Sequence, residues 1–430
     1  MSEPVKEEAK KTRRKLNLST KFLIGMVLGA IVGLIFKEKV SVIAFIGDMF
    51  MRLLRMCMFP MVLLSIITAI AQVADIGRLK KVGGMFIAYV ICGSAIAGIF
   101  GAISFYAIRP GSNLHWTIDA TSEGATAAAE AAGSVGTTLI NNIVNWIPSN
   151  PFESLSTGTL VQIVFFAIFF GIVLAVIRDQ EPTTKLALQC ISGLNNVVLG
   201  MINAVLQVAP IGIFAMVANM VGTTGFDAIS AVGGFMIAYY IGIVAFFFIV
   251  LMSVIKFGCK LSPIRYIRNV FPVIITALST LSSAGTIPVT SEATKKNLGV
   301  PSDIVDLLVA PAATINMNGA AVEQVAYIIF ASFCYDIKLS IPQLILSVIL
   351  CVVMSIGAAG VPGGGVIMGT ICMGIMGFPD QVVLLIAGVY TIMDFGATVV
   401  NVLGDTVGMT FIASKLGELD RDVYNSDNVV

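Results

Sequence analysis

The sequence predicts an all-α polytopic membrane protein. Hydrophobic residues make up 57% of the 430-residue chain and charged residues only 12%. Soluble domains rarely have so few charged residues. Uncharged runs long enough to cross a bilayer lie at 82–108, 228–255 and 339–379, and a run at 160–177 comes close to that length. The strands of a membrane β-barrel alternate polar and apolar residues over short segments. These runs do not, so helices are expected.

Lysine and arginine gather at the expected cytoplasmic ends of the spans. Six of them lie between positions 6 and 15, and no small-residue cleavage site follows the first apolar run. Because basic residues collect on the cytoplasmic side, we expect an uncleaved first helix with its N terminus inside. The polar tail from Lys415 is expected to be cytoplasmic and mobile. The expected location is the cell inner (plasma) membrane, with many passes and both termini in the cytoplasm.

Cysteine and histidine offer little chemistry in this chain. The seven cysteines are scattered, mostly within apolar runs, and none forms a CxxC pair. We interpret them as small buried hydrophobic residues rather than disulfide or metal ligands. The single histidine, His115, falls in a predicted extracellular loop and leaves no histidine metal site and no histidine base. No organic cofactor and no nucleic-acid partner are expected.

The first half of the chain has the pattern of ordinary spans. Helices are expected at 22–36, 40–73, 82–108, 160–177 and 228–255. A further span is expected between the last two, ending at 208–214 (VAPIGIF). Gly25, Gly29 and Gly33 recur every four residues, which allows the first helix to approach another closely.

The second half contains a duplicated unit of broken segments. Residues 277–290 (ALSTLSSAGTIPVT) and 354–366 (MSIGAAGVPGGGV) each combine small residues with a proline, between apolar arms too short to span. A helix with a polar interruption follows each one, at Asn316–Gly319 and at Asp394–Asp405. Paired interruptions of this kind indicate the binding site of a transporter. We therefore predict two re-entrant hairpins, with two kinked helices as the simpler alternative.

The stretch from Met393 to Asp405 (MDFGATVVNVLGD) carries a regular polar pattern inside an apolar segment. Asp394, Thr398, Asn401 and Asp405 are spaced by four, three and four residues, which places them on one face of a helix. A carboxylate at the bilayer centre costs roughly 3 kcal/mol on insertion scales, so such residues usually face a cavity and serve a function. Two acids and an amide in register favour a functional face over the polar stripe of an ordinary bundle helix.

Several long motifs resemble the dicarboxylate/amino acid:cation symporter family, which includes glutamate transporters and neutral amino acid exchangers. They are FMRLLRMCMFPMVLLSI, APIGIFA, SSAGTIPVT, ATINMNGAAVEQ, SIGAAGVPGGG and DFGATVVNVLGD, and they follow one another over almost the whole chain. The resemblance implies a homotrimeric secondary transporter surrounded by membrane lipid, and not an enzyme. It implies eight transmembrane helices, two re-entrant helical hairpins, inverted repeats and an elevator mechanism.

The resemblance also implies a division of the chain into six segments. They are a cytoplasmic tail (1–18), scaffold helices 1–2 (19–81), transport-domain helix 3 (82–109), the extracellular loop with scaffold helices 4–5 (110–225), the rest of the transport domain (226–416) and a second cytoplasmic tail (417–430). In the fifth segment helix 6 is followed by hairpin 1 (about 264–297), helix 7, hairpin 2 (about 340–376) and helix 8.

The family's ligand for the substrate amino group matches Asp394. Dicarboxylate carriers of the family lack an acid there, so the resemblance implies a substrate with an α-amino group. The other implied substrate-binding positions are Ser282, Ser283, Val361, Pro362, Gly365, Ala397, Thr398 and Asn401. Hairpin tips expose helix-terminal N–H groups, which are ready sites for a carboxylate.

Three departures from the acidic-substrate members favour a neutral L-amino acid. Ala397 stands where those members have an arginine, Ala320 where they have a threonine, and Leu281 where they have an arginine in the first hairpin. A substrate side-chain carboxylate without the guanidinium would be buried unpaired, at a cost of at least ~2 kcal/mol. Small polar amino acids, larger apolar ones and cystine all stay open. A carrier of acidic amino acids or dicarboxylates is the alternative.

Two sodium sites of the family are implied in this chain. Asn316, Asn401 and Asp405 match the first. The second is built mainly from carbonyl groups and matches Ala312, Thr314, Ser355, Ile356 and Ala358. At the third site Asn318, Cys92 and Gly93 replace oxygen ligands and a negative charge that a hard cation requires, so the third sodium is expected to be absent.

Glu323 adds a carboxyl one turn beyond Asn318–Gly319, where acidic-substrate relatives have an aromatic residue. Some relatives carry a proton at the adjacent position, here Gln324. Because burial favours the neutral form of a carboxyl, Glu323 is a candidate proton carrier. The simpler alternatives are a glutamate bonded to a neighbour or one near the outer interface. Because two sodium sites of the family are implied, Na+ is the expected coupling ion. Proton-coupled or exchange-type transport is the alternative that Glu323 raises.

A channel and an intramembrane enzyme are the rival functions. An amine acceptor together with a carboxylate cradle argues for stoichiometric substrate binding rather than for conduction. Asp394 and Asp405 stand three turns apart, about 16 Å on the ideal rise, which is too far for a pair that shares a proton. The sequence has no HExxH motif and its polar residues offer no Ser–His pair.

Overall fold

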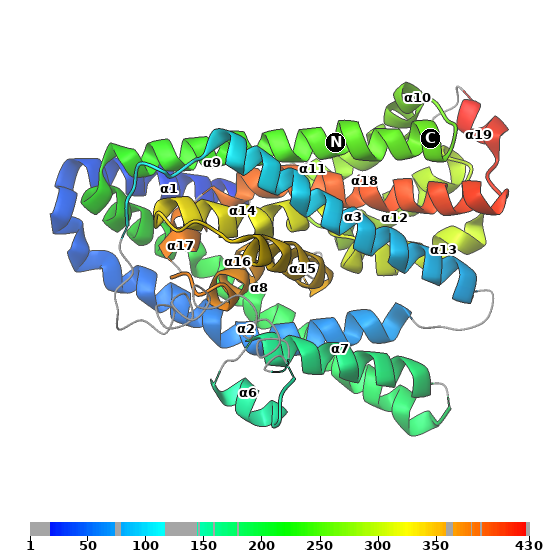
Figure 1. Ribbon diagram of the computed structural model, residues 1–430, viewed down its shortest axis with the longest axis horizontal. Coiled ribbons are helices and arrows are strands. Elements are labelled where there is room, and N and C mark those ends of the chain that lie inside the picture. The colour runs from blue at the N-terminus through cyan, green and yellow to red at the C-terminus, as the bar shows by residue number, and fades with distance from the viewer. Residues whose placement is uncertain are drawn as a thin grey trace, which may run out of the picture.

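The computed structural model describes residues 18–73, 79–116, 144, 147–157, 160–178, 180–357, 364–379, 381–387 and 389–426. All regular structure in these ranges is helical, as predicted (Figure 1). Six helical stretches among them are long and apolar enough to cross a membrane: Thr20–Phe50, Lys81–Ile108, Pro182–Val205, Phe226–Gly258, Ser302–Cys334 and Ile392–Leu416. The full set of eight spans and two re-entrant hairpins stays a prediction.

A first group of helices is built around a 43-residue helix, α8. Its members are α1 (Leu18–Phe36), α2 (Ala44–Val73), α7 (Leu160–Ile177) and α8 (Pro182–Thr224), with the 3-10 turn η1 (Lys37–Ile43) before α2 and the short α6 (Pro151–Thr157) before α7. α8 packs along both α1 and α2, and α2 also packs on α7.

The glycines of α1 make its contact with α8 close. A Cβ atom on Gly25, Gly29 or Gly33 would lie 2.5 to 2.6 Å from a backbone oxygen of α8. No side chain larger than hydrogen fits at that distance, so the two backbones touch. The close helix contact predicted from the glycine spacing is confirmed.

Two boundaries predicted in this group are wrong. The fifth span does not end at 208–214, because α8 continues through Pro210 to Thr224. The turns after the proline pack against α1 and α2, and this packing outweighs the one hydrogen bond that a proline removes. The second helix begins at Ala44 rather than Val40, because Lys37–Ile43 form the 3-10 turn.

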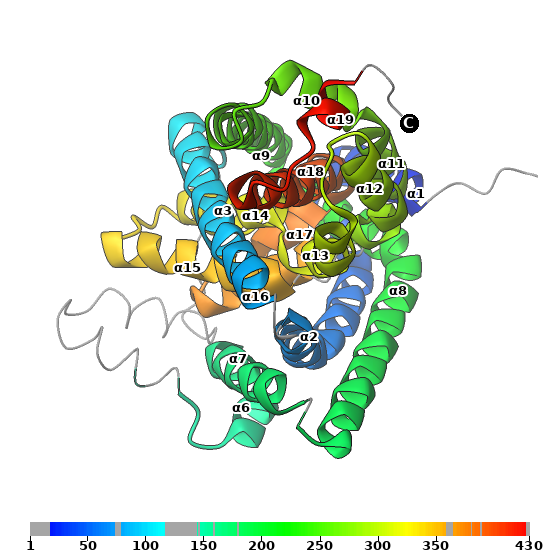
Figure 2. The same cartoon turned by 90° about the vertical axis from the view of Figure 1, so that its right-hand side faces the viewer.

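A second group of helices surrounds α14 (Asn318–Cys334), whose 17 residues are all buried. The group also contains α3 (Leu79–Ile108), α9 (Phe226–Ala245) with its π-helical extensions η2 (Phe246–Leu251) and η3 (Val254–Gly258), α13 (Ser302–Ile315), α17 (Gln381–Ala387) and α18 (Tyr390–Leu416). α14 packs on α3, α9 and α18. In the end-on view these helices lie together, with α2, α7 and α8 on one side of them (Figure 2).

Two pairs of short helices complete the second group. α11 (Phe271–Thr280) and α12 (Ser283–Lys296) form the first pair and are joined by two residues. α15 (Ile341–Gly357) and α16 (Gly364–Ile375) form the second, and their connection at 358–363 lies outside the described residues. The helices of each pair pack on each other, and an interrupted helix follows each pair: α13–α14 after the first, α17–α18 after the second. The repeated order of elements agrees with the duplicated unit in the sequence.

The C-terminal tail is docked rather than mobile as far as Ser426. Its helix α19 (Arg421–Asn425) packs against α10 (Pro263–Asn269). Tyr424 is fully buried, and its hydroxyl donates a 2.8 Å hydrogen bond to the carbonyl of Ser262. The Asn269 amide donates to the carbonyls of Asn297 (2.7 Å) and Tyr424 (3.0 Å). The mobility expected from polar composition is wrong here, because these specific hydrogen bonds hold the segment at the base of the first helix pair.

Candidate functional site

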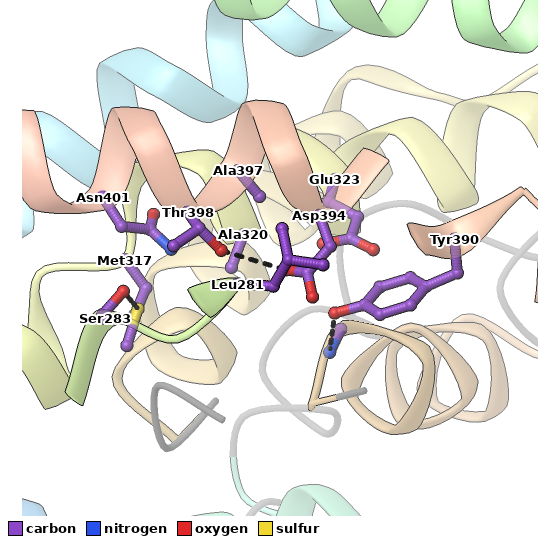
Figure 3. Close-up of a pocket in the computed structure, with 11 residues that line it drawn as sticks. Leu281, Ser283, Met317, Ala320, Glu323, Tyr390, Asp394, Ala397, Thr398 and Asn401 are labelled. Atoms are coloured by element: carbon purple, nitrogen blue, oxygen red, sulfur yellow. Dashed lines mark hydrogen bonds between the residues drawn. The ribbon is translucent and has the colours of Figure 1, made fainter. Parts of the chain in front are cut away.

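A cavity lies where the first helix pair, α14, α16 and α18 meet (Figure 3). It has an empty volume of about 320 Å³. Its lining consists of Leu281, Ser283, Met317, Ala320, Glu323, Gly365, Tyr390, Asp394, Ala397, Thr398 and Asn401. The polar residues Asp394, Thr398 and Asn401 were predicted to share one face of a helix, and they line the same cavity from α18.

Asp394 is a buried carboxyl, with 8% of its surface exposed. The Thr398 hydroxyl donates a 3.2 Å hydrogen bond to its Oδ1 atom, and both residues point into the cavity (Figure 3). None of the residues that line the cavity is lysine, arginine or histidine. A buried carboxylate normally has a cationic or donor partner, so the cavity suits a ligand that carries positive charge beside Asp394.

The chain has few basic residues that could compensate this charge. Between Arg268 and Lys415 only Lys295, Lys296 and Lys338 occur. Lys295 pairs with an aspartate and Lys296 with a glutamate outside the cavity, and Lys338 is exposed. The described residues that line the cavity therefore supply no positive charge, and a ligand that enters it can.

The turn between α11 and α12 brings the start of a helix to the cavity. Leu281 has a left-handed backbone (φ 50°), which costs a non-glycine residue roughly 1 kcal/mol. Ser282 then caps α12, because its Oγ atom accepts a 3.1 Å hydrogen bond from the N–H of Gly285. Ser283 lines the cavity, with its hydroxyl 4.0 Å from the sulfur of Met317. Of the two predicted serines, only Ser283 is among the lining residues.

Glu323 enters the cavity from α14 and is 1% exposed. The Tyr327 hydroxyl donates a 3.0 Å hydrogen bond to its Oε1 atom. A Cβ atom on Gly365 would lie 2.5 Å from both carboxyl oxygens, so this glycine lets the first turn of α16 approach them. The N–H of Gly365 donates a 3.1 Å hydrogen bond to the Tyr390 hydroxyl, which ties α16 to α18 (Figure 3). Glu323 is thus both bonded to a neighbour and part of the cavity wall.

The residues predicted for the first sodium site meet where α14 crosses α18. A Cβ atom on Gly319 would lie 2.4 Å from the Cα atom of Ala397, so the two backbones touch at this point. The N–H of Gly319 donates a 2.7 Å hydrogen bond to Oδ1 of Asn401, and the Asn316 amide donates a 2.8 Å hydrogen bond to Oδ1 of Asp405.

Asp405 is 1% exposed and has no basic partner among the described residues. A buried carboxylate grouped with amide oxygens is a donor set that suits a hard cation. The residues present therefore fit a sodium ion, and the site would supply a charge and oxygen ligands to it.

The second predicted sodium set is only partly described. Thr314 lies near the end of α13, and Ser355 and Ile356 lie near the end of α15, a helix that packs on α13. Ala312 is buried on α13. Ala358 lies outside the described residues, as do Val361 and Pro362 of the predicted substrate site.

Tyr390 and Met317 line the cavity but were not among the residues predicted for it. Tyr390 precedes Asp394 by four residues, so the helical spacing that identified the polar face could have identified it too. Met317 lies at the interruption between α13 and α14, where its backbone (φ −103°, ψ 64°) leaves the helical region. Its side-chain direction depends on that break, which the sequence alone does not define.

Comparison with known proteins identifies the family. The family model described as "Sodium:dicarboxylate symporter family" matches residues 18–415. The chain belongs to this family. The sequence resemblance is therefore confirmed, and this sodium:dicarboxylate symporter homologue is a secondary transporter and not an enzyme.

Relatives of this symporter differ in what they carry. A "Proton/sodium-glutamate symport protein" of Bacillus caldotenax is 30% identical over 421 residues, which cover 95% of this chain and 97% of the relative. The protein of the same description from Geobacillus stearothermophilus has the same identity and coverage. An "L-cystine uptake protein TcyP" of Bacillus thuringiensis is 29% identical over 94% of this chain and 90% of its own. The chain is a cation-coupled symporter of a family whose members have different substrates.

Proposed function

We propose that this symporter carries a neutral L-amino acid together with a cation. The supporting observation is the composition of the cavity: it offers Asp394 to an amino group and contains no basic residue for a side-chain carboxylate. Ala397, Ala320 and Leu281 line it where the acidic-substrate members have polar or basic residues. An acidic substrate would bury its side-chain carboxylate unpaired, which is unfavourable.

The substrate would lie with its amino group at Asp394 and its carboxylate toward Ser283 and Asn401. Ser283 is the first residue of α12, and the free N–H groups of a helix N terminus favour an anion. Because the N–H of Gly319 bonds to the Asn401 oxygen, the Asn401 amide nitrogen is left to donate to the carboxylate. These roles are part of the proposal, as are those of Thr398 beside the amino group and of the backbone at Gly365.

The proposal is tested by ligand-induced thermal stabilisation of the purified protein across a panel of amino acids in sodium chloride. Alanine, serine and larger apolar amino acids are expected to raise the unfolding temperature more than aspartate or glutamate. Competition in which aspartate or glutamate displaces the neutral amino acids would overturn the proposal. The variant Ala397→Arg is expected to shift preference toward aspartate, because it adds a guanidinium at a position that lines the cavity.

We propose sodium as the coupling ion, held by Asn316, Asn401 and Asp405, with a second site at the ends of α13 and α15. The buried Asp405 supports this role, since it lacks a basic partner among the described residues. Asp405→Asn is expected to weaken the dependence of uptake on sodium. The absence of the family's third sodium stays a prediction, to be tested by the ion stoichiometry of uptake.

A proton-coupled carrier is a second candidate, supported by the buried position of Glu323 in the cavity wall. If the carrier is proton-coupled, an imposed pH gradient is expected to drive uptake into proteoliposomes. Uptake that follows a sodium gradient and ignores a pH gradient would remove this candidate.

We further propose an elevator movement within a homotrimer. The division of the helices into a group around α8 and a group around α14 supports a static and a moving part. Helix α2 lies between them, since it packs on α7 and α8 of its own group and on α13, α15 and α16 of the other.

A further inference from the structure

Glu323 places a second carboxyl in the same cavity as Asp394 (Figure 3). Its Oε1 atom accepts the hydrogen bond from Tyr327, and its Oε2 atom accepts none from the described residues. The residue is 1% exposed and points into the cavity, so its carboxyl group is open to the cavity. A carboxyl oxygen that lacks a hydrogen bond from the described residues and borders the cavity favours a ligand group that donates to it.

No basic side chain occurs among the described residues that line the cavity. The titratable side chains that interact electrostatically with Glu323 are Tyr239 of α9, Tyr327 of α14, Cys372 of α16, and Asp394 and Tyr390 of α18. None of them is basic. Of the residues proposed for the sodium ion, Asn401 lines the cavity, whereas Asn316 and Asp405 do not. The two carboxyls therefore face a ligand without any compensating cation in the wall.

We propose that Glu323 binds a second amino group, so that short diamino acids are substrates of this symporter beside the neutral amino acids and bind more tightly than monoamino acids of the same length. The inference rests on the proposed function, because it uses the same cavity and leaves the α-amino group at Asp394. A positively charged ammonium at Glu323 satisfies the open oxygen and neutralises the second carboxylate. When a monoamino substrate is bound, a proton on Glu323 would neutralise its carboxylate instead. Neutral amino acids are then the weaker substrates.

The second amino group belongs on a short side chain. The carboxyl groups of Asp394 and Glu323 line one cavity together with Tyr390 and interact electrostatically (Figure 3). Because one cavity holds both carboxyls, we expect an amino group on the β or γ carbon to reach Glu323 while the α-amino group stays at Asp394, and longer side chains test this expectation.

A matched pair of ligands tests the inference. 2,4-Diaminobutyrate and norvaline have side chains of the same length that end in an ammonium and a methyl group. Binding to the purified full-length protein is measured by calorimetry in sodium chloride at neutral pH, with ornithine and lysine to test the length. We expect 2,4-diaminobutyrate to bind about tenfold more tightly than norvaline, in keeping with one buried charged hydrogen bond.

Two variants assign the preference to Glu323. Glu323→Gln keeps the shape and removes the charge, so it should abolish the preference for 2,4-diaminobutyrate and retain norvaline binding, which also reports that the variant is folded. Gly365→Ala should reduce the preference as well, because its methyl group would lie against the carboxyl. Glu153→Gln removes an exposed carboxyl of α6 and should behave as the wild type.

The outcomes separate the inference from the proposed function. Equal affinity for the two ligands in the wild type, or a preference that survives in Glu323→Gln, would overturn the inference. Norvaline uptake that is driven by a pH gradient and stops in Glu323→Gln, without a preference for the diamino acid, would also overturn it in favour of a proton carrier. If no amino acid binds at all, the proposed function itself fails.

Discussion

Asp394 is the residue on which substrate binding should depend most. It combines three properties: it lies on the polar face of α18, it is buried, and it lines the cavity. A carboxylate in such a place is costly unless a cation neutralises it. In the proposed function the substrate amino group removes this cost, so the cavity would select for amines.

We predict that Asp394→Ala abolishes amino acid binding. Removing one partner of a buried ion pair typically costs about 3–5 kcal/mol, which corresponds to a loss of affinity of more than about 100-fold. The measurement is thermal stabilisation by the best wild-type ligand, together with uptake into proteoliposomes. Asp48→Ala, at an exposed aspartate of α2, is the control and should bind normally. Wild-type affinity in Asp394→Ala would show that the amino group is bound elsewhere.

At the scale of elements, close backbone contacts decide how the helices cross. Three glycines of α1 touch α8, and Gly319 of α14 touches the backbone of α18. Without Cβ atoms these helices approach until the surrounding side chains interlock, and lipid gives little other driving force for the association. The crossing at Gly319 also brings Asn401 to the start of α14, where its oxygen accepts a backbone hydrogen bond.

We predict that Gly29→Leu lowers the thermal stability of the purified protein by several degrees. A Cβ atom at this position would lie 2.6 Å from the carbonyl oxygen of Phe214, so α1 must move away from α8. Gly193→Leu on α8 is the matched control, because nothing lies within 4 Å of the Cβ position there. Similar unfolding temperatures for the two variants would contradict the close contact.

The docked C-terminal helix α19 makes a second prediction at this scale. Tyr424→Ala should destabilise the protein by about 3–5 kcal/mol, because it empties a fully buried aromatic position. Tyr424→Phe removes only the hydrogen bond to Ser262 and should cost about 1 kcal/mol. Thermal unfolding of the two variants measures the difference. If the alanine variant is no less stable than the phenylalanine variant, the tail does not depend on this side chain for its docking.

At the scale of the whole molecule, the question is whether the two helix groups move against each other. Contacts between them are fewer and more scattered than within each group, and α2 makes several of them. One is polar: the Ser65 hydroxyl of α2 donates a 3.2 Å hydrogen bond to the carbonyl of Gly357 at the end of α15. This contact would have to break in an elevator movement.

A cross-link across that contact should stop transport and leave binding intact. The variant Ser65→Cys/Gly357→Cys, made in a background without the seven native cysteines, would be oxidised to a disulfide. We expect uptake to fall to background and to recover on reduction, while ligand-induced thermal stabilisation persists. Unchanged uptake in fully cross-linked protein would exclude relative movement at this contact. The single-cysteine variants are the controls.

The membrane helices, the polar face of α18 and the close contact of α1 could be predicted from local sequence. Low charge and long apolar runs predict membrane helices, because the bilayer restricts composition along each span. Helical spacing alone placed Asp394, Thr398 and Asn401 on one face, and the glycine spacing predicted the contact of α1. The proposal of a neutral substrate came from single positions such as Ala397, which were compared with the family to which the chain belongs.

Only the tertiary structure decided what meets at the cavity. Glu323 and Gly365 lie on α14 and α16, and nothing in their sequence spacing predicts that they face Asp394 of α18 across one cavity. The same holds for α8, which passes through Pro210 because α1 and α2 pack on its later turns, and for the docked tail, whose hydrogen bonds join residues far apart in the chain. Periodicity and composition are local properties. Helix crossings and buried polar partners depend on which distant segments pack together.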